Sequence, residues 1–312
     1  MLRAAFAAPA GERVLLGIGD DAAVIAPGSD PLVWTVDASV EGVHFRRDLL
    51  SLADVGYRAT MAAASDLAAM GAAPVGLLAS LVLPSWMTDE DLAALAAGQR
   101  EAADAIGAAV IGGNLAKGGE LSITTTALGA AARPLTRAGA RPGDAVWMAG
   151  PVGLAAAGLA MLLRGDASRA DGDRSTAASE AIAAWRRPQA RIADGLRAAP
   201  KAHAAIDVSD GLAQDLGHVA EASGVQIIVD ARTIVGPALR GAAAEIGRDA
   251  VDLALHGGED YAVVVVLAGD DALDGFVRIG EVAPRAGDAR VALRREDGAV
   301  AAIEARGFDH FR

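Results

Sequence analysis

The chain has 312 residues, of which 53% are hydrophobic, so we expect about two folded domains and exclude a mainly disordered protein. Its 28 Lys and Arg against 40 Asp and Glu give a formal net charge of −12, which argues against a nucleic-acid partner bound by phosphate neutralisation. The absence of cysteine excludes disulfide scaffolds, cysteine-ligated metals and thiol nucleophiles.

The first half of the chain alternates strand-like runs with helix-capping signals. A capping box at Ser51 and Asp54 opens a helix that Gly71 closes, and Thr88 caps a second helix that ends at Gly107. Short β-rich runs flanked by Gly, Pro and Asp predict strands at 14–17, 32–36, 75–83, 109–111 and 121–128.

A polar segment with Pro and Gly at 133–144 marks the expected domain boundary, so we predict domains at 1–137 and 138–312. The pattern predicts an α/β fold throughout, or an α+β fold, in two domains. A charged stretch of small residues at 165–179 is expected to be a surface loop. Further elements are expected as helices at 154–164 and 212–222, and as strands at 145–149, 206–208, 225–229 and 261–267, the last of them central.

The longest apolar runs, 152–163 and 261–268, are shorter than the roughly 18 residues of a membrane span. No secretory segment stands out near the first residue. We therefore expect a cytoplasmic protein with no membrane partner.

Aspartates recur at or near the ends of apolar elements, and this is the unusual feature of the sequence. Such carboxylates would repel one another unless cations lay among them, and oxygen ligands favour Mg²⁺. For a single Asp, a simple preference for turns is favoured by roughly two to one. Asp66 is harder to explain in that way, because it lies inside a predicted helix of small residues at 62–70. The set comprises Asp20, Asp21, Asp37, Asp66, Asp207 and Asp210.

Glycine-rich segments accompany these aspartates, although the chain has no P-loop motif. Gly17-Ile18-Gly19 is followed by two aspartates where a bare pyrophosphate would be repelled. Gly112-Gly113-Asn114 is expected to form a turn after a strand, and Gly257-Gly258-Glu259-Asp260 a turn before one. Together with the aspartates, these turns indicate a metal-bridged site for phosphoryl transfer.

Seven blocks of the sequence resemble thiamine-monophosphate kinases, and they follow in the family's order. The blocks are GIGDDA (17–22), VDASVEGVHF (36–45), SDLAAMGA (65–72), LTRAGARPGD (135–144), DVSDGL (207–212), GGEDY (257–261) and GFDHF (307–311). The resemblance thus extends over nearly the whole chain.

The resemblance implies ATP-dependent phosphorylation of thiamine monophosphate to thiamine diphosphate, with ATP as co-substrate and several Mg²⁺ ions. It also implies the fold of the aminoimidazole-ribonucleotide-synthetase superfamily, with a homodimer whose N-terminal domains close a β-barrel. Metal ligands carried over by matching positions are Asp21, Thr35, Asp37, Asp66, Asn114, Asp207 and Asp210. The residues implied to contact ATP are Arg137, Ser209, Gly112 and Gly113. Those implied to contact thiamine monophosphate are His44, Glu259 and Phe308. The resemblance assigns catalytic roles to Asp66, Asp210 and Arg137.

Two positions depart from the family pattern. Asn114 stands where many members have a metal-binding Asp, and Phe308 where Trp or Tyr is common. The alternatives are therefore a synthetase-like ATP-dependent enzyme of the same superfamily, or a sensor that binds nucleotide and thiamine phosphate without turnover.

Overall fold

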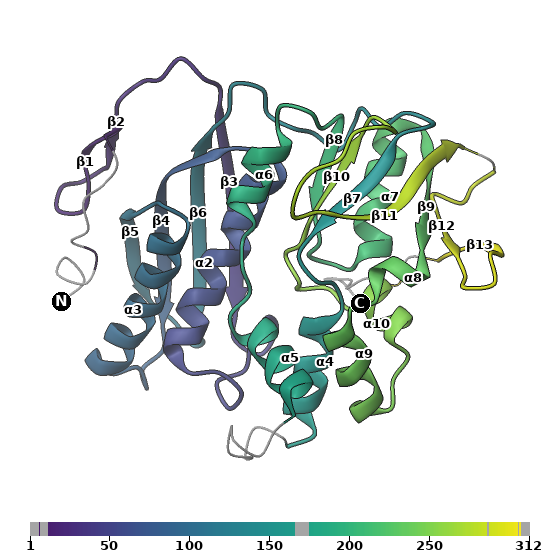
Figure 1. The fold of residues 1–312 in the computed structure, drawn as a ribbon. Helices are drawn as coiled ribbons and strands as arrows, with labels where there is room; N and C mark the ends of the chain where they lie inside the picture. The colour runs from purple at the N-terminus through teal and green to yellow at the C-terminus, as the bar shows by residue number, and fades with distance from the viewer. Residues whose placement is uncertain (1–5, 7–11, 166–174, 286, 305, 307–312) are drawn as a thin grey trace. The chain divides into compact units, whose positions relative to one another are not determined.

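The computed structural model describes residue 6, residues 12–165, 175–285 and 287–304, and residue 306 (Figure 1). The chain divides into two compact units, one of residues 1–67 with 72–134 and one of residues 68–71 with 135–312. Each unit has its own sheet and its own helices, so the two are described in turn.

The first unit is built on a four-stranded sheet in the order β3-β6-β4-β5. Strands β3 and β4 are antiparallel to β6, whereas β5 runs parallel to β4. A small separate hairpin, β1 with β2, precedes the sheet. The strands are β1 (Val14–Leu16), β2 (Val24–Ile25), β3 (Leu32–Val40), β4 (Ala73–Leu83), β5 (Val110–Lys117) and β6 (Ser122–Ala130).

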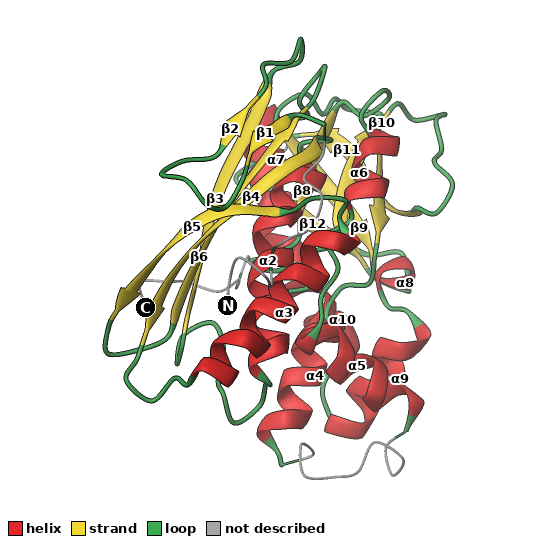
Figure 2. Cartoon of the chain, turned by 90° about the vertical axis from the view of Figure 1, so that its left-hand side faces the viewer, coloured by secondary structure: helices red, strands yellow, loops and turns green. Residues whose placement is uncertain are grey.

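Helices α2 (Leu52–Ala69) and α3 (Asp89–Ala105) lie along one face of this sheet (Figure 2). The two helices approach closely at glycines: a Cβ on Gly56 would lie 2.1 Å from the carbonyl oxygen of Leu95, and one on Gly98 would lie 1.8 Å from that of Ala53. On β6 the alternate residues Ile123, Thr125 and Ala127 are buried, as expected for a strand with one face covered.

The opposite face of the sheet carries exposed apolar side chains. On the edge strand β3, Leu32 is 56% exposed, Trp34 70% and Val36 64%. The sheet is open, with β3 and β5 as its edges, and no closed barrel is found among the residues that the structure describes. The barrel predicted from the resemblance depends on a second copy and is taken up below.

The second unit is an α+β domain with a seven-stranded sheet in the order β13-β12-β9-β11-β7-β10-β8. All pairs are antiparallel except β12 with β9, and helix α7 lies against β8 and β9. Strand β10 is buried along its whole length between β7 and β8. The strands are β7 (Ala145–Ala149), β8 (Ala204–Asp207), β9 (Val225–Asp230), β10 (Val263–Leu267), β11 (Val277–Pro284), β12 (Val291–Arg294) and β13 (Val300–Ala302). The helices are α4 (Leu154–Leu163), α5 (Thr176–Arg186), α6 (Ile192–Ala198), α7 (Leu212–Ser223), α8 (Ala231–Ile234), α9 (Pro237–Ile246) and α10 (Ala250–His256).

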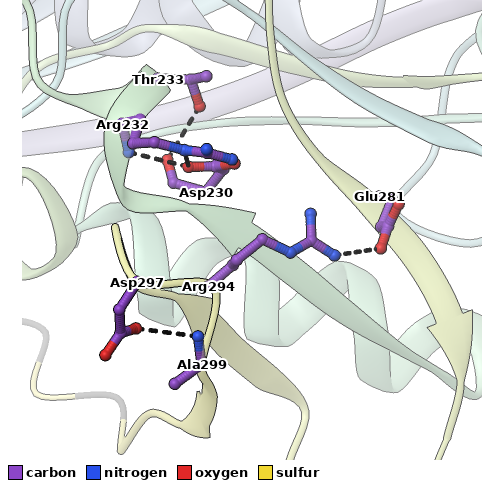
Figure 3. A network of polar contacts seen from close by, with 7 residues as sticks. All are labelled: Asp230, Arg232, Thr233, Glu281, Arg294, Asp297 and Ala299. Carbon is purple, nitrogen blue, oxygen red and sulfur yellow. Dashed lines mark hydrogen bonds and ion pairs between the residues drawn. The ribbon is translucent and has the colours of Figure 1, made fainter.

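Charged pairs lie on the part of this second sheet formed by β9, β11 and β12 (Figure 3). At the end of β9, Asp230 accepts hydrogen bonds from the backbone nitrogen and Nε of Arg232, both at 2.9 Å, and this guanidinium lowers the pKa of the Asp230 carboxyl. Arg294 on β12 donates to Glu281 on β11 at 2.5 Å. These charges are paired with one another, so we do not assign them to the functional site.

Three predicted boundaries are wrong. Strand β3 continues through Asp37 to Val40, so Asp37 lies within a strand rather than after one. Helix α5 begins at Thr176, where Ser175 caps it, inside the predicted loop; residues 166–174 of that loop lie outside the described residues. Strand β10 begins at Val263 rather than at 261, because Tyr261 has a left-handed backbone with φ +52°.

The expected turn at Gly112-Gly113-Asn114 is also wrong, because these residues continue β5 to Lys117. Ile111 is an irregularity in the register with β4, after which Gly112 to Lys117 pair regularly with Leu78 to Leu83. A Cβ on Gly113 would lie 1.9 Å from the carbonyl oxygen of Ala79, so the close strand approach requires glycine there. Within the described part of the chain, no helix combines the length and apolar character needed to cross a membrane.

Candidate active site

On the helix-covered face of the first unit, a hydroxyl is hydrogen-bonded to one carboxylate, and a second carboxylate follows on the same strand face. Thr35 on β3 donates a hydrogen bond from Oγ1 to Asp66 Oδ2 on α2. Asp37 is two residues further along the same strand and therefore on the same face, and its Cα atom is about 6.6 Å from that of Thr35. Asp37 is exposed, and its Oδ1 accepts from the backbone nitrogen of Ala38 at 3.0 Å. Three of the predicted metal ligands are thus brought to one place.

The other face of the same sheet has a cavity of about 640 Å³, which holds four more predicted residues. The cavity is lined by residues 17–23 around the β1–β2 hairpin and by parts of β4, β5 and β6. It contains Asp21, Gly112, Gly113 and Asn114.

The register separates Asn114 from Asp37. Asn114 pairs with Ser80, Ser80 with Thr124, and Thr124 with Ala38, whereas Asp37 belongs to the next row and the opposite face. Edge strands β5 and β3 are three strand spacings apart, about 14 Å. Asn114 and Asp37 of one chain are therefore too far apart, and face the wrong way, to ligate one ion.

His44 is held in the loop after β3 by contacts with Val40. The backbone nitrogen of Val40 donates to His44 Nδ1 at 3.1 Å, and the backbone nitrogen of His44 donates to the Val40 carbonyl at 2.9 Å. Because Nδ1 accepts, the neutral ring carries its proton on Nε2. The turn requires Gly42, whose φ is +81°.

In the second unit, Asp207 ends β8, and the loop that follows carries Ser209 and Asp210 and is organised by Asp215. The backbone nitrogens of Ser209, Asp210 and Gly211 donate to Asp215 Oδ2 at 3.1, 3.1 and 3.2 Å. Burial, together with the nearby carboxylates of Asp207 and Asp210, raises the pKa of the Asp215 carboxyl to about 8. Asp215 is not among the residues predicted from the sequence, although its position in the first turn of the helix after the Asp-Gly pair was a usable signal.

The turn before β10 is hydrogen-bonded to this loop. The backbone nitrogen of Glu259 donates to the Ser209 carbonyl at 2.7 Å, and that of Tyr261 donates to the Val208 carbonyl at 2.8 Å. Gly258 has φ +71°, and a Cβ there would lie 2.7 Å from the Ser209 oxygen. The predicted substrate contact Glu259 is thereby fixed beside the predicted metal loop.

Asp260 anchors the same turn to helix α4. Its carboxylate accepts hydrogen bonds from the backbone nitrogens of Gly153 at 2.6 Å and Ala155 at 3.0 Å, at the helix N-terminus. Burial raises the pKa of Asp260 to about 7, although these hydrogen bonds oppose the shift. Trp185 on α5 donates from Nε1 to Glu259 Oε2 at 3.0 Å, a contact that no sequence motif indicated.

The remaining predicted residues are placed less closely. Arg137 is exposed; its carbonyl accepts from Ser223 Oγ at 3.2 Å, and its charge helps burial to lower the pKa of His218. Phe308 lies outside the described residues. Among the residues that the structure describes, no three His, Asp or Glu side chains are grouped closely enough to hold a metal by themselves.

Comparison with known proteins identifies the family. Two family descriptions match, "AIR synthase related protein, N-terminal domain" over residues 19–131 and "AIR synthase related protein, C-terminal domain" over residues 141–290. A thiamine-monophosphate kinase of Mycobacterium tuberculosis strain H37Rv is 36% identical over 293 residues, covering 91% of this chain and 83% of its own. The chain belongs to the thiamine-monophosphate kinase family.

Solved structures agree with this membership. A thiamine-monophosphate kinase from Stenotrophomonas maltophilia K279a has a TM-score of 0.83 at 34% identity, covering 96% of this chain and 95% of its own. AaThiL complexed with AMPPCP and TMP has a TM-score of 0.82 at 31% identity, covering 94% and 92%. The two-domain fold expected from the resemblance is confirmed in its AIR-synthase-type domains.

Proposed function

We propose that this chain transfers the γ-phosphoryl group of ATP directly to thiamine monophosphate, forming thiamine diphosphate and ADP. The chain is a kinase by its family. The observation that carries the proposal is the similarity, over 94% of the chain, to a structure that binds an ATP analogue and TMP together. The sequence blocks quoted above, from Gly17 to Tyr261, lie within the described residues of this fold.

Magnesium fits the residues that the chain offers. The candidate ligands are oxygen donors throughout: Asp21, Thr35, Asp37, Asp66 and Asn114 in the first unit, and Asp207 and Asp210 in the second. Burial raises the pKa of Asp215 most, and the neighbouring carboxylates of Asp207 and Asp210 raise it further; a cation beside these two carboxylates would relieve their mutual repulsion. When bound, Mg²⁺ supplies charge neutralisation for the anionic phosphates.

This phosphoryl transfer requires little covalent participation by the protein. The attacking atom is a phosphate oxygen of thiamine monophosphate, largely ionised at neutral pH because a phosphate monoester has a second pKa of about 6. A general base is therefore not required. Asp66 and Asp210 would hold the metal. Arg137, Ser209, Gly112 and Gly113 bind ATP. The protein therefore needs only to hold the anionic phosphates of ATP and thiamine monophosphate in line for transfer.

The acceptor is bound by His44, Glu259 and Phe308. The proton on His44 Nε2 makes that nitrogen a donor suited to a phosphate oxygen. Glu259 supplies negative charge to the cationic thiamine moiety, and Phe308 an aromatic face for it. Asn114, on the cavity face of the first sheet with Asp21, ligates through its amide oxygen.

The functional protein is a homodimer in the cytoplasm, where ATP is available. Residues 1–137 form the domain that pairs with its copy, and residues 138–312 form the second domain. The exposed apolar side chains of Leu32, Trp34 and Val36 support this pairing, since a second sheet covering them would close the barrel.

Two other functions are distinguishable by product. A synthetase-like reaction of the same superfamily would consume ATP without forming thiamine diphosphate, and a sensor would bind both ligands without turnover. The replacement of a common Asp by Asn114 is the feature that favours the sensor.

The test is ADP release from ATP and Mg²⁺ with and without thiamine monophosphate, with the thiamine product identified by mass. We expect ADP release that requires thiamine monophosphate, matched by an equal amount of thiamine diphosphate. Stimulated ADP release with no diphosphate, or binding of both ligands without turnover, would overturn the proposal.

A further inference from the structure

The Glu259 carboxylate is hydrogen-bonded to an indole from a distant part of the chain. Trp185 lies in the last turn of α5 and is only 2% exposed, and its Nε1 donates to Glu259 Oε2 at 3.0 Å. A buried indole N–H normally has a polar partner, and here that partner is a residue that we place at the substrate.

The backbone around Glu259 is held in an unfavourable conformation. Glu259 and Tyr261 have φ values of +58° and +52°, and among the described residues they are the non-glycine positions in the left-handed region. Such conformations persist only where surrounding contacts impose them, and they concentrate at functional sites. The contacts here are the hydrogen bonds to Val208 and Ser209 on one side, and those of Asp260 to helix α4 on the other.

The donor in this contact is neutral, so the hydrogen bond itself adds no positive charge at the carboxylate. An indole N–H is a single donor, and it holds one oxygen of Glu259 in a fixed direction. A carboxylate attracts cationic ligands, and the thiamine moiety has a positively charged ring.

We propose that Trp185 is a specificity-determining positioning residue, which orients the Glu259 carboxylate toward the cationic ring of the phosphate acceptor. This inference rests on the proposed function, since the acceptor is thiamine monophosphate. Trp185 acts through Glu259 and does not itself contact the phosphates being joined.

The first experiment compares Trp185→Phe, which removes the N–H and retains an aromatic ring, with Trp147→Phe as the matched control. Trp147 on β7 is in the same unit, and its Nε1 has no hydrogen-bond partner in the described part of the chain. Loss of a hydrogen bond to a charged group predicts about a tenfold rise in KM for thiamine monophosphate in Trp185→Phe. We expect kcat and KM for ATP to stay within about twofold of wild type, and Trp147→Phe to change none of these constants.

A double-mutant cycle with Glu259→Gln separates positioning from packing, because glutamine keeps an acceptor but loses the charge. If Trp185 acts through the Glu259 charge, Trp185→Phe has no further effect on KM in the Glu259→Gln background. An equal rise in KM in both backgrounds, a parallel rise for ATP, or an unchanged KM in Trp185→Phe would overturn the inference.

An NMR measurement does not require a folded Trp185 variant. The chain has four tryptophans, so ¹⁵N-tryptophan labelling gives four indole N–H signals. We expect one of them to move in Glu259→Gln and, in the wild type, the same signal to move on adding thiamine monophosphate. If no indole signal responds to both changes, the inference is contradicted.

The proposed function can fail separately. If the wild type forms no thiamine diphosphate, binding of thiamine monophosphate by calorimetry replaces KM, with the same variants and control. If only Trp185→Phe binds thiamine monophosphate more weakly, the positioning role of Trp185 is supported. If the wild type, Trp185→Phe and Trp147→Phe bind it equally well, that role is refuted.

Discussion

Thr35 on the edge strand β3 donates its hydroxyl hydrogen bond to Asp66 on helix α2, which joins two predicted metal ligands that are 31 residues apart. The bond fixes the Asp66 carboxylate at a point where Asp37 follows on the same strand face. The sheet and its covering helix therefore pre-organise two side chains of the proposed cation site.

Replacing Thr35 tests this pre-organisation. Thr35→Val keeps the shape but removes the hydroxyl, and we expect turnover at limiting Mg²⁺ to fall about 10- to 100-fold. Thr35→Ser keeps the donor and should stay close to wild type. Equal activity of the two variants across a Mg²⁺ titration would show that the hydroxyl has no part in the site.

Asp66→Asn removes one negative charge with little change in volume. We expect kcat to fall about 100-fold or more, with an unchanged circular dichroism spectrum, because a metal-bound phosphate loses its counter-charge. Asp104→Asn is the control, since Asp104 is an exposed residue of the same unit that pairs with Arg100 at 3.7 Å. Near-wild-type turnover of Asp66→Asn at low Mg²⁺ would refute the metal assignment.

Gly258→Ala tests the contact between the Glu259 turn and the metal loop. Both a positive φ and a 2.7 Å approach to the Ser209 carbonyl oppose a side chain there. Gly287→Ala is the matched control, because its φ of +70° is almost the same and nothing lies within 4 Å of the added Cβ. We expect Gly258→Ala to lose most of its kcat/KM for thiamine monophosphate, while Gly287→Ala loses only stability, by about 1 kcal/mol. Similar kinetics for the two variants would contradict a functional role for this approach.

The pKa of Asp260, raised from 3.8 to about 7, predicts a pH effect on stability. The folded chain retains a proton that the unfolded chain releases, so this group's contribution is fully present below about pH 4 and is lost as pH rises to about 7. Asp260→Asn cannot titrate, so its free energy of unfolding should rise relative to wild type over this range, by at most about 4 kcal/mol. Denaturant unfolding at pH 4.5 and 7.5 measures the difference; a pH-independent difference would show that the shift is absent.

The exposed face of the first sheet predicts the oligomeric state. Trp34→Glu places a charge at the centre of the proposed contact, and we expect the dimer to dissociate in sedimentation experiments. Val277→Glu, at a residue of the second unit that is 53% exposed, should leave the dimer intact. A monomeric wild type, or a Trp34→Glu variant that still dimerises at micromolar concentration, would rule out pairing through this face.

The features that the sequence predicted well depend on neighbours along the chain. Thr88 caps α3 as expected: its Oγ1 accepts from the backbone nitrogen of Asp91 at 3.1 Å, and the Asp91 carboxylate accepts from the backbone nitrogen of Thr88 at 3.0 Å, which makes a capping box. The helix containing Asp66 was likewise predicted from its caps, Ser51 and Gly71. Both signals lie within a few residues of the element that they start or end.

The features that it missed depend on partners far away in the chain. Whether Asn114 faces the cavity or the helices is set by the register of β5 on β4 and by the irregularity at Ile111, which no local pattern encodes. Trp185 and Glu259 are 74 residues apart, and their contact requires helix α5 to pack beside the turn before β10. The family motifs supplied the candidate residues, and the topology decides which of them share a face.

The most direct test of the central claim is a single-turnover reaction with [γ-³²P]ATP, Mg²⁺ and thiamine monophosphate. Direct transfer predicts that the label appears in thiamine diphosphate at the rate at which ADP forms, with none accumulating as inorganic phosphate. Label released as inorganic phosphate while ADP forms, or label that stays in ATP, would contradict the account.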